Sequence, residues 1–131
     1  MKSGSIARKY ESEIADIILR TDGILVYLPK PNLKIDLDAA RKILVYGKKV
    51  VDHPVPVLVH MGLIRRVSRE ARALFASDEY TQLAAQSALL VSSPVSRVIG
   101  NFFVGLNKPL YPLQLFTDEN DAVVWLKEFL R

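Results

Sequence analysis

Residues 54–61, "PVPVLVHM", decide the fold class of this chain. The segment is short and nearly all apolar, and His60 is its only ionisable residue. A strand with this pattern is typical of the centre of a parallel sheet, where helices cover both faces and neither face meets water. We therefore expect residues 54–61 to form a central strand of an α/β sheet.

The sequence before this strand predicts a β-hairpin and a helix. Two runs rich in β-formers, residues 14–19 and 24–28, flank "TDG" at 21–23, whose Asp-Gly pair supplies the positive φ angles of a tight turn. In "KIDLDAARKILVYGKKVVDHP" (34–54), apolar residues recur at helical spacing, and Asp36 or Asp38 is expected to cap the helix. We expect that helix to end before the final proline of the segment.

The sequence after the strand alternates between helices and strands. A loop rich in Gly and Arg is expected at 61–67, and a short helix is expected in "SREARALFAS" (68–77). The segment "DEYTQLAAQ" (78–86) is compatible with another turn or two of helix. The apolar runs "SALLV" (87–91) and "YPLQLF" (111–116) predict two further strands.

Two more helices complete the pattern. "SSPVSRVIGNFFVG" (92–105) has a serine cap, a proline in its first turn and a glycine at its end. Its apolar stripe is expected to comprise Val95, Val98, Ile99, Phe102 and Phe103. "TDENDAVVWLKEFLR" (117–131) has an acidic first turn that suits the helix dipole. Its inward side chains are expected to be Ala122, Trp125, Leu126 and Phe129.

These elements predict one α/β domain over residues 1–131. A hairpin followed by alternating helices and strands forms a mixed, mostly parallel sheet that is covered by about four helices. The chain has 131 residues, of which 50% are hydrophobic, and it contains no repeat or low-complexity segment. This composition is that of a globular domain with a packed core.

Composition and charge exclude several function classes. The chain has no cysteine, so it has neither a disulfide framework nor a thiolate metal site. Residues 1–10 lack the apolar core of a signal peptide, and no stretch is long and apolar enough to span a bilayer. The net charge is +4, but no basic run is interleaved with aromatic residues as in nucleic-acid-binding proteins. We expect a cytoplasmic protein that binds no nucleic acid.

An arginine cluster around Ser68 is the first candidate site. Ser68 is expected to cap the helix at 68–77, and it is also a candidate phosphoacceptor because nearby arginines would bond to a phosphate. The candidate residues for binding an anion or an acidic partner are Arg65, Arg66, Arg69 and Arg72. The alternative is that these arginines form a solvated face.

A second candidate lies on the helix at 92–105. Phe102 and Phe103 are adjacent and therefore point about 100° apart, so one of them is left to line a pocket or an interface with a second copy of the chain. Arg97 and Asn101 lie one turn apart and are candidates for the same pocket or interface. Core packing of the phenylalanines and solvation of the polar pair are the alternatives.

No catalytic or metal site is predicted. His53 and His60 lack a metal-binding spacing, and no GxSxG motif surrounds a serine. "GNFFVG" (100–105) is followed by leucine where a phosphate-binding loop requires lysine. The sequence therefore implies no cofactor.

The segments "SREARALFAS", "SPVSRVIGNFFVGLNKPLYP" and "LFTDENDAVVWL", with the order of elements, resemble the STAS domain of bacterial anti-anti-sigma factors. They are most similar to a family of small bacterial proteins described as SpoIIAA-like or STAS/SEC14-like. The resemblance implies a STAS-like fold. It also implies a serine at the start of a helix that a partner kinase phosphorylates, and the matching position is Ser68.

The sequence thus favours a non-catalytic regulatory module that binds a protein partner, with a second copy of the chain as one option. A module for a small ligand is the alternative, with an anion bound at residues 65–72 or an apolar or lipid molecule bound under the aromatic helix. The third hypothesis is that the protein is an enzyme of unrecognised type.

Overall fold

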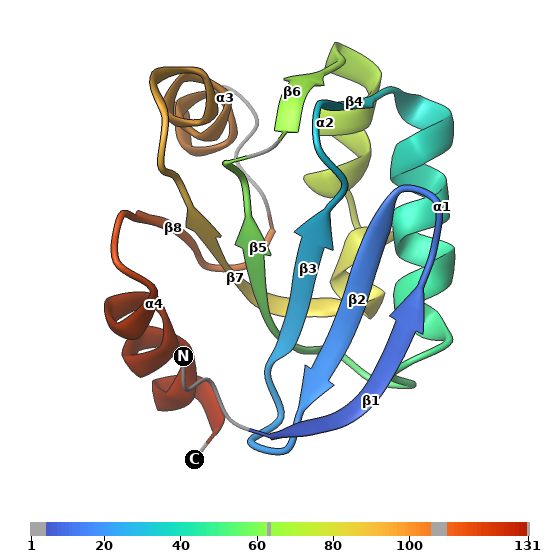
Figure 1. Cartoon of the computed structure of the whole chain (residues 1–131), viewed down its shortest axis with the longest axis vertical. Coiled ribbons are helices and arrows are strands. Elements are labelled where there is room, and N and C mark those ends of the chain that lie inside the picture. The colour runs from blue at the N-terminus through green and yellow to red at the C-terminus, as the bar shows by residue number, and fades with distance from the viewer. Residues whose placement is uncertain (1–4, 63, 106–109, 131) are drawn as a thin grey trace.

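The computed structural model describes residues 5–62, 64–105 and 110–130, and for residues 102–105 it describes the backbone alone. A six-stranded sheet lies at the centre, in the order β1-β2-β3-β5-β7-β8 (Figure 1). The first three strands pair antiparallel, whereas β3, β5, β7 and β8 pair parallel. The sheet consists of β1 (Ile6–Glu11), β2 (Ala15–Arg20), β3 (Leu25–Pro29), β5 (Val55–His60), β7 (Ala84–Leu90) and β8 (Leu113–Phe116).

This sheet confirms the predicted α/β class. The tight turn at 21–23 joins β2 to β3, and Gly23 has a φ of 92°. β5 is the predicted central strand, and its first four residues are buried. β1 was not expected, because its side chains are almost all exposed and show no apolar alternation.

A second, two-stranded sheet pairs β4 (Leu33–Ile35) with β6 (Ile64–Val67) in parallel. The expected loop at 61–67 is therefore wrong for residues 64–67, which form a strand. Each strand is short, and its partner lies far away in the sequence, so neither has a strong local signal. We call this pair the β4–β6 ribbon.

In the part of the chain that the structure describes, four α-helices cover the sheet, as predicted. α1 (Leu37–Lys48), α2 (Arg69–Phe75) and α3 (Pro94–Gly105) lie on one face with the ribbon, and α4 (Glu119–Lys127) lies on the other (Figure 1). The described chain also has 3₁₀ turns at Tyr80–Gln82 and Glu128–Leu130. None of the helices within the described residues is long and apolar enough to cross a membrane.

Side-chain caps fix where three of the helices start. The carboxylate of Asp36 accepts the amide of Ala39 at 2.8 Å. Asp118 accepts the amides of Asn120 and Asp121 at the start of α4. The cap of α2 is Ser68, as expected from the sequence.

Two hydrophobic cores result from this arrangement, one on each face of the sheet. The larger core lies under α1, α2, α3 and the ribbon. The smaller one lies under α4 and consists of Ile24, Val26, Leu58, Ala88, Ala122 and Leu126. Among the described elements, α4 is the one helix on this second face, and it leaves part of the face uncovered.

The predicted inner face of α3 is partly wrong. Ile99 is buried, but Val95 is 53% exposed and Val98 is 56% exposed. Ser96 takes the buried position instead, because its hydroxyl accepts the amides of Ser92 and Ser93, both at 3.0 Å, and so turns its face of the helix inward. The expectation for Phe102 and Phe103 concerns side chains outside those described.

The prediction for the inner face of α4 is confirmed for Ala122 and Leu126, which are both fully buried. Trp125 is half-buried between Phe116 and Phe129. Phe129, by contrast, is 39% exposed. The α-helix ends at Lys127 and the chain continues in a 3₁₀ turn, so the helical spacing no longer applies at this residue.

Candidate ligand-binding cavity

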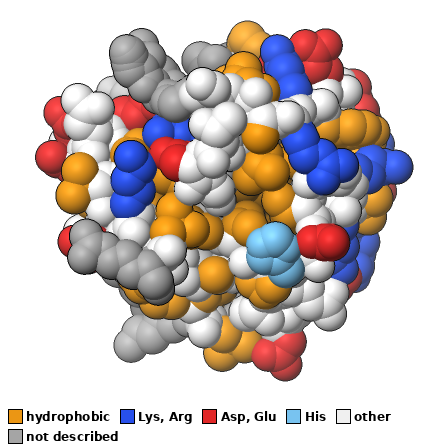
Figure 2. All heavy atoms as spheres, turned by 90° about the horizontal axis from the view of Figure 1, so that it is seen from below, with side chains coloured by type: hydrophobic (Ala, Val, Ile, Leu, Met, Phe, Trp, Pro, Cys, Tyr) orange, Lys and Arg blue, Asp and Glu red, His pale blue; other side chains and the backbone are white. Residues whose placement is uncertain are grey.

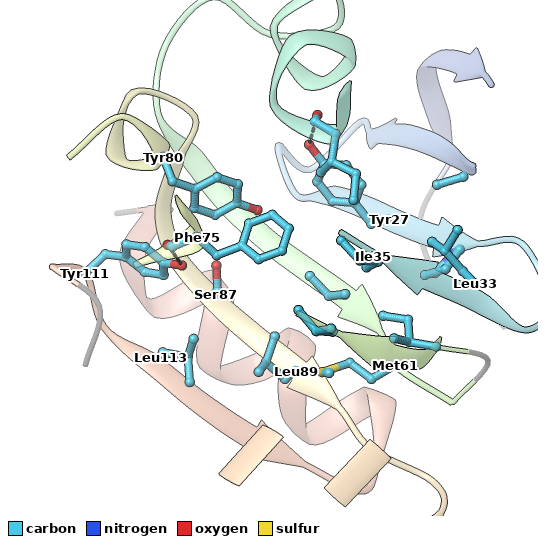
Figure 3. A pocket seen from close by; sticks show the side chains of 16 residues that line it. Tyr27, Leu33, Ile35, Met61, Phe75, Tyr80, Ser87, Leu89, Tyr111 and Leu113 are labelled. Carbon is cyan, nitrogen blue, oxygen red and sulfur yellow. Dashed lines mark hydrogen bonds between the residues drawn. The ribbon is translucent and has the colours of Figure 1, made fainter. Parts of the chain in front are cut away.

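An apolar cavity of about 60 Å³ lies between the sheet and the β4–β6 ribbon (Figure 3). The ribbon provides the aliphatic side chains of Leu33, Ile35, Ile64 and Val67. The lining residues come from elements that are distant in the sequence, and no lysine, arginine, aspartate or glutamate is among them. The cavity is therefore a product of the tertiary fold.

The sheet provides the opposite wall through alternate residues of its strands. Tyr27 from β3, Val59 from β5, and Ser87 and Leu89 from β7 all line the cavity. Successive side chains of a strand point to opposite faces, so these residues share the face under the ribbon. The alternation of residues along each strand shows in the sequence which side chains share a face, but it does not show which face holds a cavity.

Aromatic rings form one end of the cavity. Phe75 and Tyr80 meet edge to face with ring centroids 5.3 Å apart, and Tyr80 and Tyr111 are 5.8 Å apart. The hydroxyl of Tyr111 donates a hydrogen bond to the carbonyl of Phe75 at 2.9 Å. Figure 3 shows these rings side by side, with Ser87 beside them. The hydrogen bond ties the end of α2 to the segment before β8.

The hydroxyl groups in the cavity stay protonated at neutral pH. Burial raises the pKa of Tyr27, Tyr80 and Tyr111 above the ordinary value of a phenol. Tyr27 donates to the carbonyl of Ile43 at 3.2 Å, which holds its ring against α1. The cavity therefore offers apolar contacts and a few neutral hydroxyls.

The predicted arginines lie on the outside of the same ribbon. Arg65 and Arg66 are exposed on β6, and Arg69 is exposed at the start of α2. Lys34 is exposed on β4 and is the cross-strand neighbour of Arg66. Within the described residues none of these four forms an ion pair, and we call Lys34, Arg65, Arg66 and Arg69 the basic face.

Arg72 is the exception in the predicted cluster. Its side chain is half-buried, and its guanidinium donates to the carbonyl of Val67 at 2.9 Å. This bond joins α2 to the end of the ribbon. The structure thus places three of the predicted arginines together on the surface, whereas the fourth forms a hydrogen bond to the backbone.

Ser68 lies between the ribbon and α2. Its hydroxyl accepts the amide of Ala71 at 3.1 Å, and its own amide donates to the carbonyl of Ile35 at 2.9 Å. The predicted helix cap is therefore confirmed. Phosphorylation of this serine stays a prediction.

The polar pair of the second predicted site lies away from the cavity, whereas the side chains of Phe102 and Phe103 are outside those described. Arg97 and Asn101 are exposed on α3 and line neither wall. Within the described residues, no group of three or more His, Cys, Asp or Glu side chains is placed to hold a metal ion.

Comparisons with known proteins identify the fold and the family. A protein of the DUF3478 family with a SpoIIAA-like fold, from Shewanella loihica PV-4, is 12% identical with a TM-score of 0.53, covering 96% of this chain and 98% of that chain. A protein of unknown function from Arthrobacter sp. FB24 is 38% identical, covering 89% of this chain and 95% of that one, with a TM-score of 0.34. No curated protein matches this chain. The fold is therefore SpoIIAA-like. The model of the family described as Domain of unknown function (DUF7793) matches residues 17–130, so the chain belongs to that family.

Proposed function

We propose that this protein is a non-catalytic binding module that holds a small apolar molecule, or the apolar end of a larger one, under the β4–β6 ribbon. The observation that supports this proposal is the cavity of about 60 Å³, whose described lining has no charged side chain. Apolar cavities stay dry and bind small apolar molecules, as a cavity of about 150 Å³ does with benzene. The smaller volume here suits a few carbon atoms.

The chemistry of the lining favours binding over catalysis. Its hydroxyls belong to Ser87 and to three tyrosines whose pKa is raised by burial. A nucleophilic hydroxyl needs an adjacent base, and the described lining contains neither an imidazole nor a carboxylate. The groups of the cavity are suited to fix the position of a molecule and leave it unchanged.

Binding is tested by following the methyl signals of the protein in NMR spectra while xenon, a small apolar probe, is added. We expect shifts at the methyl groups of Leu89, Ile64 and Val67, which line the cavity. Val95 and Val124 are 53% and 62% exposed and serve as internal controls. Their signals should move much less.

A filled cavity provides the matched variant. Leu89→Phe adds volume at the cavity wall and is expected to abolish the shifts, while Val124→Phe on the surface leaves them unchanged. If xenon moved only the exposed methyl groups, or moved none, the proposal would be wrong.

A second candidate function is binding of an acidic protein partner at the basic face. Lys34 and Arg66 are directly opposed like charges, an arrangement that costs stability unless an anion compensates it. Neither forms an ion pair within the described residues. An acidic surface would supply that compensation.

Titration with a polyglutamate peptide tests this candidate. We expect binding that weakens as salt is added, and that falls at least about tenfold in the variant Arg65→Gln/Arg66→Gln because two charge contacts are lost. The variant Arg41→Gln/Lys42→Gln removes the same charge from α1 and is the control. Equal weakening in both variants would show that net charge alone attracts the peptide.

A further inference from the structure

A second hollow lies on the other face of the sheet, where the parallel strands β3, β5 and β7 end. Its volume is about 340 Å³, within the range of ligand sites. It is lined by Leu28, Pro29, His60, Gly62, Leu90 and Ser92. The carboxyl ends of parallel strands are the usual place of ligand sites in α/β proteins.

The hollow exists because α4 is short. This helix packs over Val26, Leu58 and Ala88, the middle residues of the three strands on this face. Two residues further along each strand, Leu28, His60 and Leu90 are only half-buried. They form a row across three neighbouring strands and present a flat surface with apolar ends and an imidazole at the centre.

Half-buried His60 and exposed Ser92 are the two residues with polar side chains among the described lining of the hollow. Within the described residues, neither the imidazole of His60 nor the hydroxyl of Ser92 forms a hydrogen bond. Ser92 uses only its amide, which donates to the hydroxyl of Ser96 at 3.0 Å. Two groups that each donate and accept a hydrogen bond thus border one apolar surface.

The lack of a side chain at Gly62 leaves room for the hydroxyl of Ser92 at the edge of the hollow. A Cβ atom at residue 62 would collide with the hydroxyl oxygen of Ser92. An alanine here would displace the serine or narrow the hollow. The absence of a side chain therefore shapes the wall next to the imidazole.

The charges around the hollow favour a neutral occupant. Burial lowers the pKa of His60, while the carboxylate of Glu119 acts in the opposite direction. The lowered pKa leaves the ring neutral at pH 7, with one donor and one acceptor nitrogen. The nearby carboxylate disfavours an anion.

We propose that this hollow is a binding site for a flat, neutral aromatic heterocycle that carries an N–H donor. Its ring lies on the row formed by Leu28, His60 and Leu90, and its N–H donates to the acceptor nitrogen of His60 or to the hydroxyl of Ser92. The hollow shares Pro29 with the cavity under the ribbon, but its other lining residues are different, and the row of Leu28, His60 and Leu90 lies on the opposite face of the sheet.

Indole is the probe, and NMR signals of the histidine rings are the readout. The chain has two histidines, so His53 is an internal control, with a side chain that is 70% exposed. We expect indole to shift the ring signals of His60 and to leave those of His53 in place. Indene, which has the same shape without the N–H, should bind about tenfold more weakly because one hydrogen bond is lost.

Three variants locate the site. Gly62→Ala and Ser92→Ala are each expected to weaken indole binding several-fold, whereas Asn101→Ala, at an exposed position of α3, does not. His60→Leu should remove the preference for indole over indene while the amide spectrum stays that of a folded protein. Equal affinity of the wild-type protein for indole and indene, or equal shifts at both histidines, would overturn the proposal. Methyl shifts of Leu89 without a change at His60 would assign indole to the other cavity and overturn it as well.

Discussion

Raising the pH above about 10 is expected to unfold this protein cooperatively. Tyr27, Tyr80 and Tyr111 are buried, and burial raises the pKa of each phenol above its value in an unfolded chain, which is about 10. Above that pH the unfolded state releases protons that the folded state keeps. The free energy of unfolding is therefore unaffected by these groups below about pH 10 and falls as the pH rises further.

The expected loss is large. Each group that ionises only on unfolding contributes up to about 1.4 kcal/mol per pH unit, so the three together contribute about 4 kcal/mol per pH unit. The free energy of unfolding of a domain is about 5 to 15 kcal/mol. A rise of two or three pH units above pH 10 would therefore be enough to unfold it. Tyrosinate absorbance and circular dichroism, followed together through an alkaline titration, are the measurements.

A single-step change in both signals is the expected result, because the three phenols ionise when the cavity opens. Tyr80→Phe removes one of them and should reduce the dependence of stability on pH by about a third of the total slope. Complete tyrosinate formation in a chain that keeps its native circular dichroism would contradict this account. It would mean that water and hydroxide reach the rings in the folded protein.

The order of the elements was predictable because the signals for it are local. The turn at Gly23 needs a positive φ, and the cap at Ser68 needs a hydroxyl next to a free amide. The apolar run of β5 needs a sheet that is covered on both faces. Each requirement is visible within a few residues.

The cavity and the hollow could not be predicted in the same way. Leu33 and Ile64 become neighbours through the pairing of β4 with β6, and no pattern in the sequence predicts this pairing. The row of Leu28, His60 and Leu90 depends on the strand order and on the short length of α4. Val95 and Val98 were misplaced because the serines at the start of α3 set its rotation.

Replacing Asp22 by alanine is expected to cost about 3 kcal/mol of stability, because it leaves a buried guanidinium without its counter-ion. The side chain of Arg20 is 5% exposed and makes two hydrogen bonds to the Asp22 carboxylate, at 3.0 and 2.7 Å. Lys127 adds a second positive charge 3.6 Å from the same carboxylate. The value lies at the lower end of the range for buried pairs because Asp22 itself is 23% exposed.

The experiment is chemical denaturation of this variant and, as a control, of Asp52→Ala, which removes a carboxylate that is 96% exposed and pairs with exposed His53. That control should leave stability nearly unchanged, because an exposed ion pair contributes little. The double variant Arg20→Met/Asp22→Ala separates the two causes of the loss. If the cost comes from the stranded charge, removing the arginine as well should restore most of the stability, because an apolar side chain of similar length fills the space under α4. A double variant as unstable as Asp22→Ala would instead assign the cost to the β2–β3 turn, where the amide of Ile24 also donates to Asp22, at 3.4 Å.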